Sequence, residues 1–146
     1  MPMIDVYAES NTFPADALPE LGKELTYAVL RAEAVAKPGQ FHLNNTVFFA
    51  HITEPGTIWT AAGDGARGVR VQIITPPNAL TRAGQIQLTG EVTEVVAKLS
   101  GDPSQAGRTW VILSEAAEGG WGIAGTAYGK EEFAALAAAA RAHSSN

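Results

Sequence analysis

The chain has 146 residues, enough for one ordinary domain or two small fused units. Hydrophobic residues make up 46% of it and charged residues 17%, a balance typical of a folded rather than a disordered protein. The net charge of −5 and the lack of a Lys/Arg cluster argue against nucleic acid as a partner, because phosphate binding needs a basic surface. The absence of cysteine excludes disulfide and thiol chemistry. The sequence shows neither a signal-peptide pattern nor an apolar run near the ~20 residues that span a membrane, so we expect a cytoplasmic protein.

The first half of the chain predicts a strand, a helix and a second strand. Residues 3–9 are short, apolar and alternating, as expected for a strand. Thr12 and Pro14 predict a helix start, with threonine as cap and proline in the first turn. Apolar residues at spacings of three and four then form one helical face up to Ala32. Residues 46–53 are rich in β-branched and aromatic side chains and predict the second strand.

The same order of elements recurs in the second half. Residues 69–75 predict a strand, and Thr81 can cap a helix that ends at Gly101. Residues 109–115 predict a further strand, followed by a glycine-rich turn. The alanine-rich segment 130–143 predicts a helix that packs as a tail.

A shift of 67 residues superposes the two halves without a gap. It places Leu21 on Leu88, Leu25 on Val92, Val29 on Val96, Ile4 on Val71 and Val6 on Ile73. We therefore predict a tandem β-α-β duplication within one domain of residues 1–146, with repeats 1–64 and 65–129, a helical tail 130–146 and a junction near Gly63-Asp64-Gly65. The fold class is α+β: one four-stranded mixed sheet with two helices on one face. Strands 46–53 and 109–115, taken as the central ones, are apolar on both faces, so we expect other subunits to cover the second face.

Two further patterns carry alternatives. Residues 120–125 spell GWGIAG, but no second strand follows to complete a dinucleotide-binding unit, which favours a β-turn or hairpin carrying an aromatic residue. No Cys or His spacing supports a metal site. His51 lies in an apolar strand and is interpreted as a structural or interface residue rather than a catalytic one.

Pro2 ahead of a β-α-β unit, together with EAAEGGWGIAG at 115–125 after the last strand, resembles the tautomerase superfamily, the group of 4-oxalocrotonate tautomerase. Short members of that family begin with a catalytic proline after methionine removal. They carry a strand ending in Glu followed by a Gly-aromatic-Gly-Ile-x-Gly hairpin. The fused, two-repeat form of this length is similar to the branch of cis-3-chloroacrylic acid dehalogenase. The resemblance covers nearly the whole chain and implies a homotrimer that mimics the hexamer of short chains.

The resemblance also implies the chemistry. Once Met1 is removed, Pro2 is a secondary amine with an ordinary α-amino pKa near ~7.7–8, and it acts as general base or acid on a small enol or keto acid without any cofactor. Nearby arginines would lower that pKa and bind the substrate carboxylate. Arg108 is the first choice for anion binding and Trp121 for a pocket wall. Trp110, Arg82 and His51 complete the candidate substrate-binding residues. The shift places Pro2 on Val69, which is internal and has no free amine, so one site per chain is expected.

The chain departs from the family at the arginines. Thr12 and Ala79 stand at the expected arginine of the loop, Thr46 and Trp110 at that of the second strand, and Pro76 and Ala79 at the dehalogenase pair. Hydrolytic dehalogenation is therefore not expected. Two alternatives stay open: a non-catalytic binding or structural protein of the same fold, and a ferredoxin-like α+β barrel, whose repeats usually pair as dimers.

Overall fold

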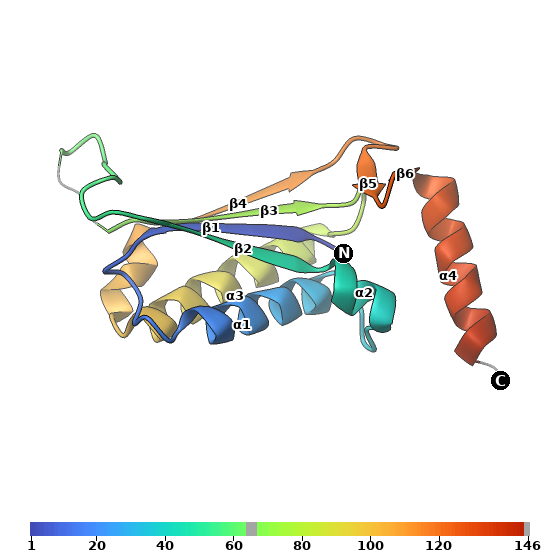
Figure 1. The fold of residues 1–146 in the computed structure, drawn as a ribbon, viewed down its shortest axis with the longest axis horizontal. Helices are drawn as coiled ribbons and strands as arrows, with labels where there is room; N and C mark the ends of the chain where they lie inside the picture. Colours follow the sequence, from blue (N-terminus) through green and yellow to red (C-terminus); the bar gives the residue numbers. More distant parts are fainter. Residues whose placement is uncertain (64–66, 145–146) are drawn as a thin grey trace.

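The computed structural model describes residues 1–63 and 67–144, and it contains a four-stranded mixed sheet with two long helices on one face (Figure 1). The strand order is β2-β1-β3-β4; β1 and β2 are parallel, β1 and β3 antiparallel, and β3 and β4 parallel. The elements in chain order are β1 Met3–Glu9, α1 Leu18–Ala32, α2 Gln40–Asn45, β2 Val47–Thr53, β3 Val69–Thr75, α3 Arg82–Ser100, the 3-10 helix η1 Pro103–Arg108, β4 Thr109–Glu115, β5 Trp121–Ile123, β6 Thr126–Tyr128 and α4 Lys130–Ser144. The expected fold class is confirmed.

The core lies between the sheet and the helix pair α1 and α3, and it is built symmetrically from the two halves. Ile4 pairs with Ile73 and Val6 with Val71 across the antiparallel β1–β3 ladder, and all four are fully buried. The five apolar pairs named above for the 67-residue shift are fully buried as well: Leu21 with Leu88, Leu25 with Val92, Val29 with Val96, Ile4 with Val71 and Val6 with Ile73. The matched apolar positions therefore form one shared core.

The strand order corrects one expectation. Strands 46–53 and 109–115 are the outer strands β2 and β4, whereas β1 and β3 are central. Apolar residues on both faces of these strands suggested a central position in the sheet. In the structure Phe49 of β2 and Ile112 of β4 lie on the face away from α1 and α3, where they are exposed. Direct pairing of β1 with β2 also excludes the split β-α-β arrangement of a ferredoxin-like fold.

The helix ends follow local sequence at α3 but not at the start of α1. Thr81 accepts a hydrogen bond from the Gly84 backbone N–H at 3.1 Å, and Gly101 ends α3 with φ of 71°, as expected. The predicted cap Thr12 is wrong: α1 begins at Leu18, with Pro19 in its first turn. Thr12 is instead buried in the preceding turn, where its N–H donates to the Glu9 carbonyl at 3.0 Å.

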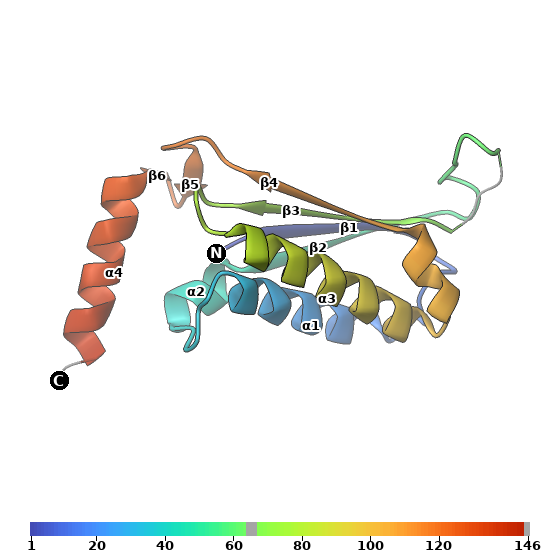
Figure 2. The ribbon, with the colours of Figure 1, turned by 180° about the vertical axis from the view of Figure 1, so that it is seen from behind.

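The smaller elements gather at the two ends of the sheet. The GWGIAG segment forms the β5–β6 hairpin, as expected, while the short helix α2 and the 3-10 helix η1 were not predicted. Helix α4 stands at the end of the sheet nearest the N-terminus, beside α2 (Figures 1 and 2). The predicted repeat boundary falls on Asp64 and Gly65, which lie outside the described residues. None of the described helices has the length and apolar character needed to cross a membrane.

The sheet face opposite α1 and α3 is open and carries a row of polar and aromatic side chains. Tyr7 stacks on His51 with ring centroids 4.3 Å apart, and the Arg70 guanidinium lies 4.1 Å from the Tyr7 ring. His51 Nε2 is 2.6 Å from Asp5 Oδ1. Apolar residues flank this row on the outer strands.

Candidate functional site

The start of the chain is buried at the sheet edge where the parallel strands β1 and β2 begin. Met1 and Pro2 are both buried, and the Pro2 carbonyl accepts a hydrogen bond from the Val47 N–H at 3.1 Å. This bond ties Pro2 to β2, so the proline extends the β1–β2 pairing by one step. The Pro2 nitrogen is therefore held at a fixed place, joined to Met1 by a tertiary amide that carries no proton.

Glu33 is the acidic group bound to the N-terminus. Its Oε2 lies 3.0 Å from the Met1 amine, and both side chains are 6% exposed. Glu33 directly follows α1, and the next residue, Ala34, turns the chain with φ of 59°. In a β-α-β unit the helix returns to the edge where both strands start, which brings this helix end to the N-terminus. The other oxygen, Oε1, is buried and has no hydrogen-bond partner among the described residues.

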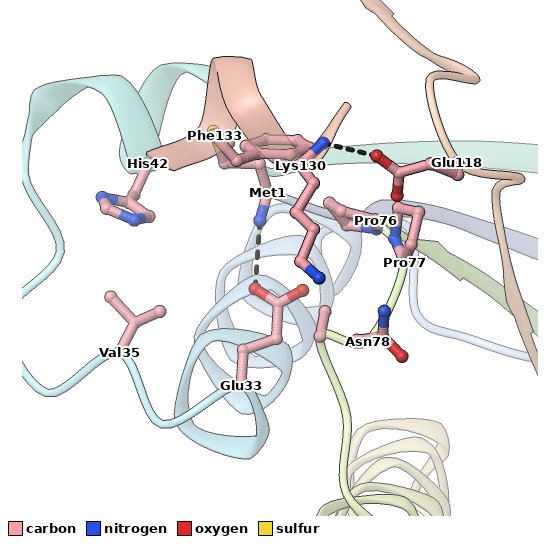
Figure 3. Close-up of a pocket in the computed structure, with 11 residues that line it drawn as sticks. Met1, Glu33, Val35, His42, Pro76, Pro77, Asn78, Glu118, Lys130 and Phe133 are labelled. Carbon is pink, nitrogen blue, oxygen red and sulfur yellow. Dashed lines mark hydrogen bonds and ion pairs between the residues drawn. The ribbon is translucent and has the colours of Figure 1, made fainter. Parts of the chain in front are cut away.

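A cavity of about 320 Å³ opens beside this ion pair (Figure 3). Its walls come from the end of α1, helix α2, the loop after β3, the segment before β5 and the start of α4. The lining residues are Met1, Glu33, Val35, His42, Pro76, Pro77, Asn78, Ala79, Glu118, Lys130 and Phe133. Among these described residues no arginine is present, whereas two carboxylates, one lysine and one histidine are.

The charged groups of the cavity are arranged around the amine. The Lys130 side chain points into the cavity toward Glu33 and Asn78 (Figure 3). The Lys130 backbone N–H donates to Glu118 Oε1 at 2.5 Å, which ties the start of α4 to the segment before β5. Burial, and then the positive N-terminus, lower the pKa of His42, while Glu33 acts in the opposite sense. His42 is therefore favoured as a neutral imidazole.

Met1 also borders a second cavity of about 390 Å³ between α2 and α4. The two cavities share Met1, His42 and Phe133 as wall residues. Phe41 and Leu136 give the second one an apolar character. Loss of Met1 would remove one of the walls that the two cavities have in common.

The residues expected from the sequence lie in different parts of the chain. Pro2 is next to the cavity. Trp121 is buried in the β5–β6 hairpin, and its Nε1–H has no partner among the described residues. Arg82 is exposed at the start of α3, where it donates to Gln85 Oε1 at 3.4 Å. None of these three side chains is among the described residues that line the two cavities.

The other three candidates lie away from the amine within one chain. Arg108 precedes β4 at the opposite end of the sheet, where its Nη2 donates to Asp102 Oδ2 at 2.9 Å and to Gln105 Oε1 at 3.0 Å. Trp110 is exposed on the open sheet face, at the same end. His51 is on the open face in the pair with Asp5. One chain therefore brings none of these three to Pro2.

Sequence reasoning missed Glu33, His42 and Lys130. A signal for Glu33 existed, because the first residue after the helix of a β-α-β unit must lie near the start of the first strand. His42 and Lys130 had no such signal, since their places depend on the short helix α2 and on the docking of α4. Among the described residues, no group of three or more His, Cys, Asp or Glu side chains could hold a metal ion.

No family model matches the sequence, and no curated protein matches it either. Similarity is found among solved structures. A protein inactivated by 2-oxo-3-pentynoate matches with a TM-score of 0.72 at 16% identity, over 88% of this chain and 97% of that one. A fused 4-OT, described as a symmetric trimer, matches with a TM-score of 0.69 at 18% identity, over 91% and 98%. A member of the cis-3-chloroacrylic acid dehalogenase family matches with a TM-score of 0.67 at 16% identity, over 92% and 90%.

Proposed function

We propose that this chain, whose fold is that of the tautomerase superfamily, is a cofactor-independent tautomerase that uses Pro2 as its acid–base group once Met1 is removed. The observation that carries the proposal is the position of the Pro2 nitrogen. It is buried and fixed by the Val47 hydrogen bond, and the residue ahead of it lines the cavity. Removal of Met1 would turn an inert amide into a secondary amine that faces the space vacated by methionine.

The walls of the cavity support a small substrate with one carbonyl or enol and one carboxylate. Lys130 supplies a cation on the cavity side, and Phe133 and Pro76 supply apolar surface. The proton moves between carbon and oxygen of such a substrate, and the positive side chain stabilises the developing enolate. Arg108, Trp110, Arg82, Trp121 and His51 remain candidates for substrate binding, with those of the far sheet end supplied by a neighbouring subunit.

We further propose a homotrimer. The open sheet face presents Phe49, Trp110 and Ile112 to solvent, each more than 40% exposed. Exposed apolar side chains on the two outer strands β2 and β4 mark a surface that gains stability when it is covered. The structurally similar fused 4-OT is described as a symmetric trimer, which is the assembly that we expect here.

A non-catalytic protein of the same fold is the second candidate. One specific observation favours it: among the described residues that line the cavity no arginine is present, so the usual anion clamp is missing. Retention of Met1 would also favour it, because the Met1 amine already forms a buried ion pair with Glu33.

The test pairs intact mass with enzyme kinetics. We expect the purified chain to lack Met1 and to ketonise phenylenolpyruvate. Pro2→Ala should lower kcat/KM by about 10²–10⁴-fold, the usual contribution of a positioned acid–base group. Pro55→Ala, in an exposed turn, is the matched proline control and should keep the wild-type rate. Equal rates for wild type and Pro2→Ala would contradict the proposal, and retained Met1 would exclude the amine mechanism.

A further inference from the structure

We propose that Glu33 is a positioning residue that keeps the Pro2 amine protonated at neutral pH, so that Pro2 acts as the proton donor of the reaction. The inference rests on the proposed function, because it concerns the amine that Met1 removal creates. It decides between the two roles, base and acid, that the sequence leaves open. The expectation that arginines lower the pKa of this amine has no counterpart among the described cavity residues.

The Glu33 carboxylate is buried beside the N-terminus. Its side chain is 6% exposed, and an ionised carboxylate at that depth is costly unless a cation pairs with it. Among the described residues the Met1 amine is the partner of Oε2, at 3.0 Å, and Oε1 has no hydrogen-bond partner. When Met1 leaves, the carboxylate loses this partner. It then needs another cation, and the amine of Pro2 is the new N-terminus.

The Glu33 carboxylate also lies within reach of the Pro2 nitrogen. Three covalent bonds separate the Met1 and Pro2 nitrogens, so they lie at most about 3.6 Å apart. Glu33 Oε2 is therefore within about 7 Å of the Pro2 nitrogen, since it lies 3.0 Å from the Met1 nitrogen. Rotation of a glutamate side chain can shorten this distance once methionine is gone. An opposite charge within about 4–6 Å shifts a pKa by roughly 1–3 units toward the charged form.

The other titratable groups around the amine do not reverse this balance. Lys130 and the neutral-favoured His42 face the cavity from α4 and α2, and Glu118 faces it from the segment before β5. Glu118 is engaged by the backbone of α4 through Oε1. Lys37 borders the second cavity. Lys130 points toward Glu33 and opposes its effect on the amine, but Lys130 is exposed, so solvent screens its charge.

A protonated Pro2 sets the direction of the chemistry. In ketonisation the ammonium N–H gives its proton to the substrate carbon, the enol hydroxyl releases its proton to water, and the neutral amine takes a proton back from water. The substrate class is therefore an enol or enolate whose carbon accepts a proton. The rate should fall as pH rises through the pKa of Pro2, because the donor is then lost.

A direct titration of the amine tests the inference. Protein with ¹⁵N-labelled proline, treated with methionine aminopeptidase and checked by mass for loss of Met1, is titrated by NMR. We expect the Pro2 amine to titrate above the ordinary α-amino value near ~8. Glu33→Gln should lower its pKa by at least about one unit, a tenfold change in the ionisation constant, and should move the high-pH fall of kcat by the same amount.

Two further variants keep the experiment decisive. Glu20→Gln removes one negative charge from the exposed start of the same helix and should leave the pKa of Pro2 unchanged. Glu33→Asp keeps the negative charge and should retain most of the increase in the pKa of the Pro2 amine. This variant also tests the inference if Glu33→Gln does not fold. A wild-type amine that titrates below 7, or equal values with and without the Glu33 charge, would overturn the inference. Because the titration needs no turnover, it decides this question even if the enzyme proposal fails.

Discussion

Asp102 shows how one side chain fixes the candidate anion-binding Arg108. Hydrogen bonds from Ser104 and then from Arg108 lower the pKa of Asp102 to about 2. A carboxyl group whose pKa is depressed in the folded state stabilises that state above its unfolded pKa of ~3.9, and this contribution is lost as pH falls toward 2. Asp102→Asn should therefore lower the thermal midpoint at pH 7, and the difference from wild type should shrink between about pH 4 and 2.

The control for this prediction is Asp16→Asn, at an exposed position in the turn before α1. Its difference from wild type should not depend on pH in the same range. Thermal melts followed by circular dichroism at several pH values provide the measurement. A constant difference for Asp102→Asn down to pH 2 would show that the hydrogen bonds to Ser104 and Arg108 do not stabilise the fold.

The sequence predicts the structural role of a residue where that role depends only on its neighbours along the chain. Thr81 was placed correctly because an N-cap is decided within three residues. The prediction for Thr12 is wrong because this residue is buried in the turn before α1, so tertiary packing rather than helix capping sets its position. Glu33 could be placed near the start of β1 from the β-α-β topology, but its burial could not be predicted, because it depends on the N-terminus packing against it.

The end of α1 is the element that sets the position of Glu33. Ala34 adopts a left-handed conformation there, and the Val35 N–H donates to the Leu30 carbonyl at 3.0 Å. A left-handed conformation costs a residue with a Cβ about 1–2 kcal/mol, which glycine avoids. Glycine relieves this strain but loses more backbone entropy on folding than alanine does. We therefore expect Ala34→Gly to raise the free energy of unfolding by about 0.5–1 kcal/mol. Urea unfolding measures it.

The contrasting variant is Ala36→Gly, two residues further along the exposed connection between α1 and α2. It lacks the left-handed backbone and should be neutral or destabilising. A destabilising effect of Ala34→Gly would mean that the alanine methyl group makes contacts worth more than the strain. The comparison thereby separates the conformational effect from the loss of a methyl group.

Element identity was predictable wherever periodicity is strong, and element order was not. The alternation in residues 3–9 and 69–75 and the helical spacing from Leu88 to Leu99 reflect one buried face each, so they are visible locally. The order β2-β1-β3-β4 depends on which strands form the edges of the sheet, and no local pattern reveals this. The sequence predicted β2 and β4 to be central because both of their faces are apolar. Helix α2 is too short, at six residues, to show a period.

The whole molecule has one covered and one open sheet face, and this asymmetry is the basis of the proposed trimer. Each chain leaves Phe49 of β2 and Trp110 and Ile112 of β4 exposed, at the two outer strands of the open face. Each of these side chains is already about half buried, so covering the rest of it stabilises an assembly by about 1 kcal/mol, and a trimer would repeat that gain in every subunit. Ile112→Asp should therefore shift sedimentation equilibrium from three times the 15.3 kDa chain mass toward one.

Ile86→Asp is the matched control, because Ile86 is also an exposed isoleucine but belongs to helix α3, on the covered side of the sheet. We expect this variant to remain trimeric. Dissociation of both variants would indicate a general loss of stability, and unchanged mass for both would place the interface elsewhere. Trimer loss with Ile112→Asp alone, accompanied by loss of ketonisation, would further indicate that a neighbouring subunit completes the site around Pro2, which is the arrangement proposed for Arg108 at the far end of the sheet.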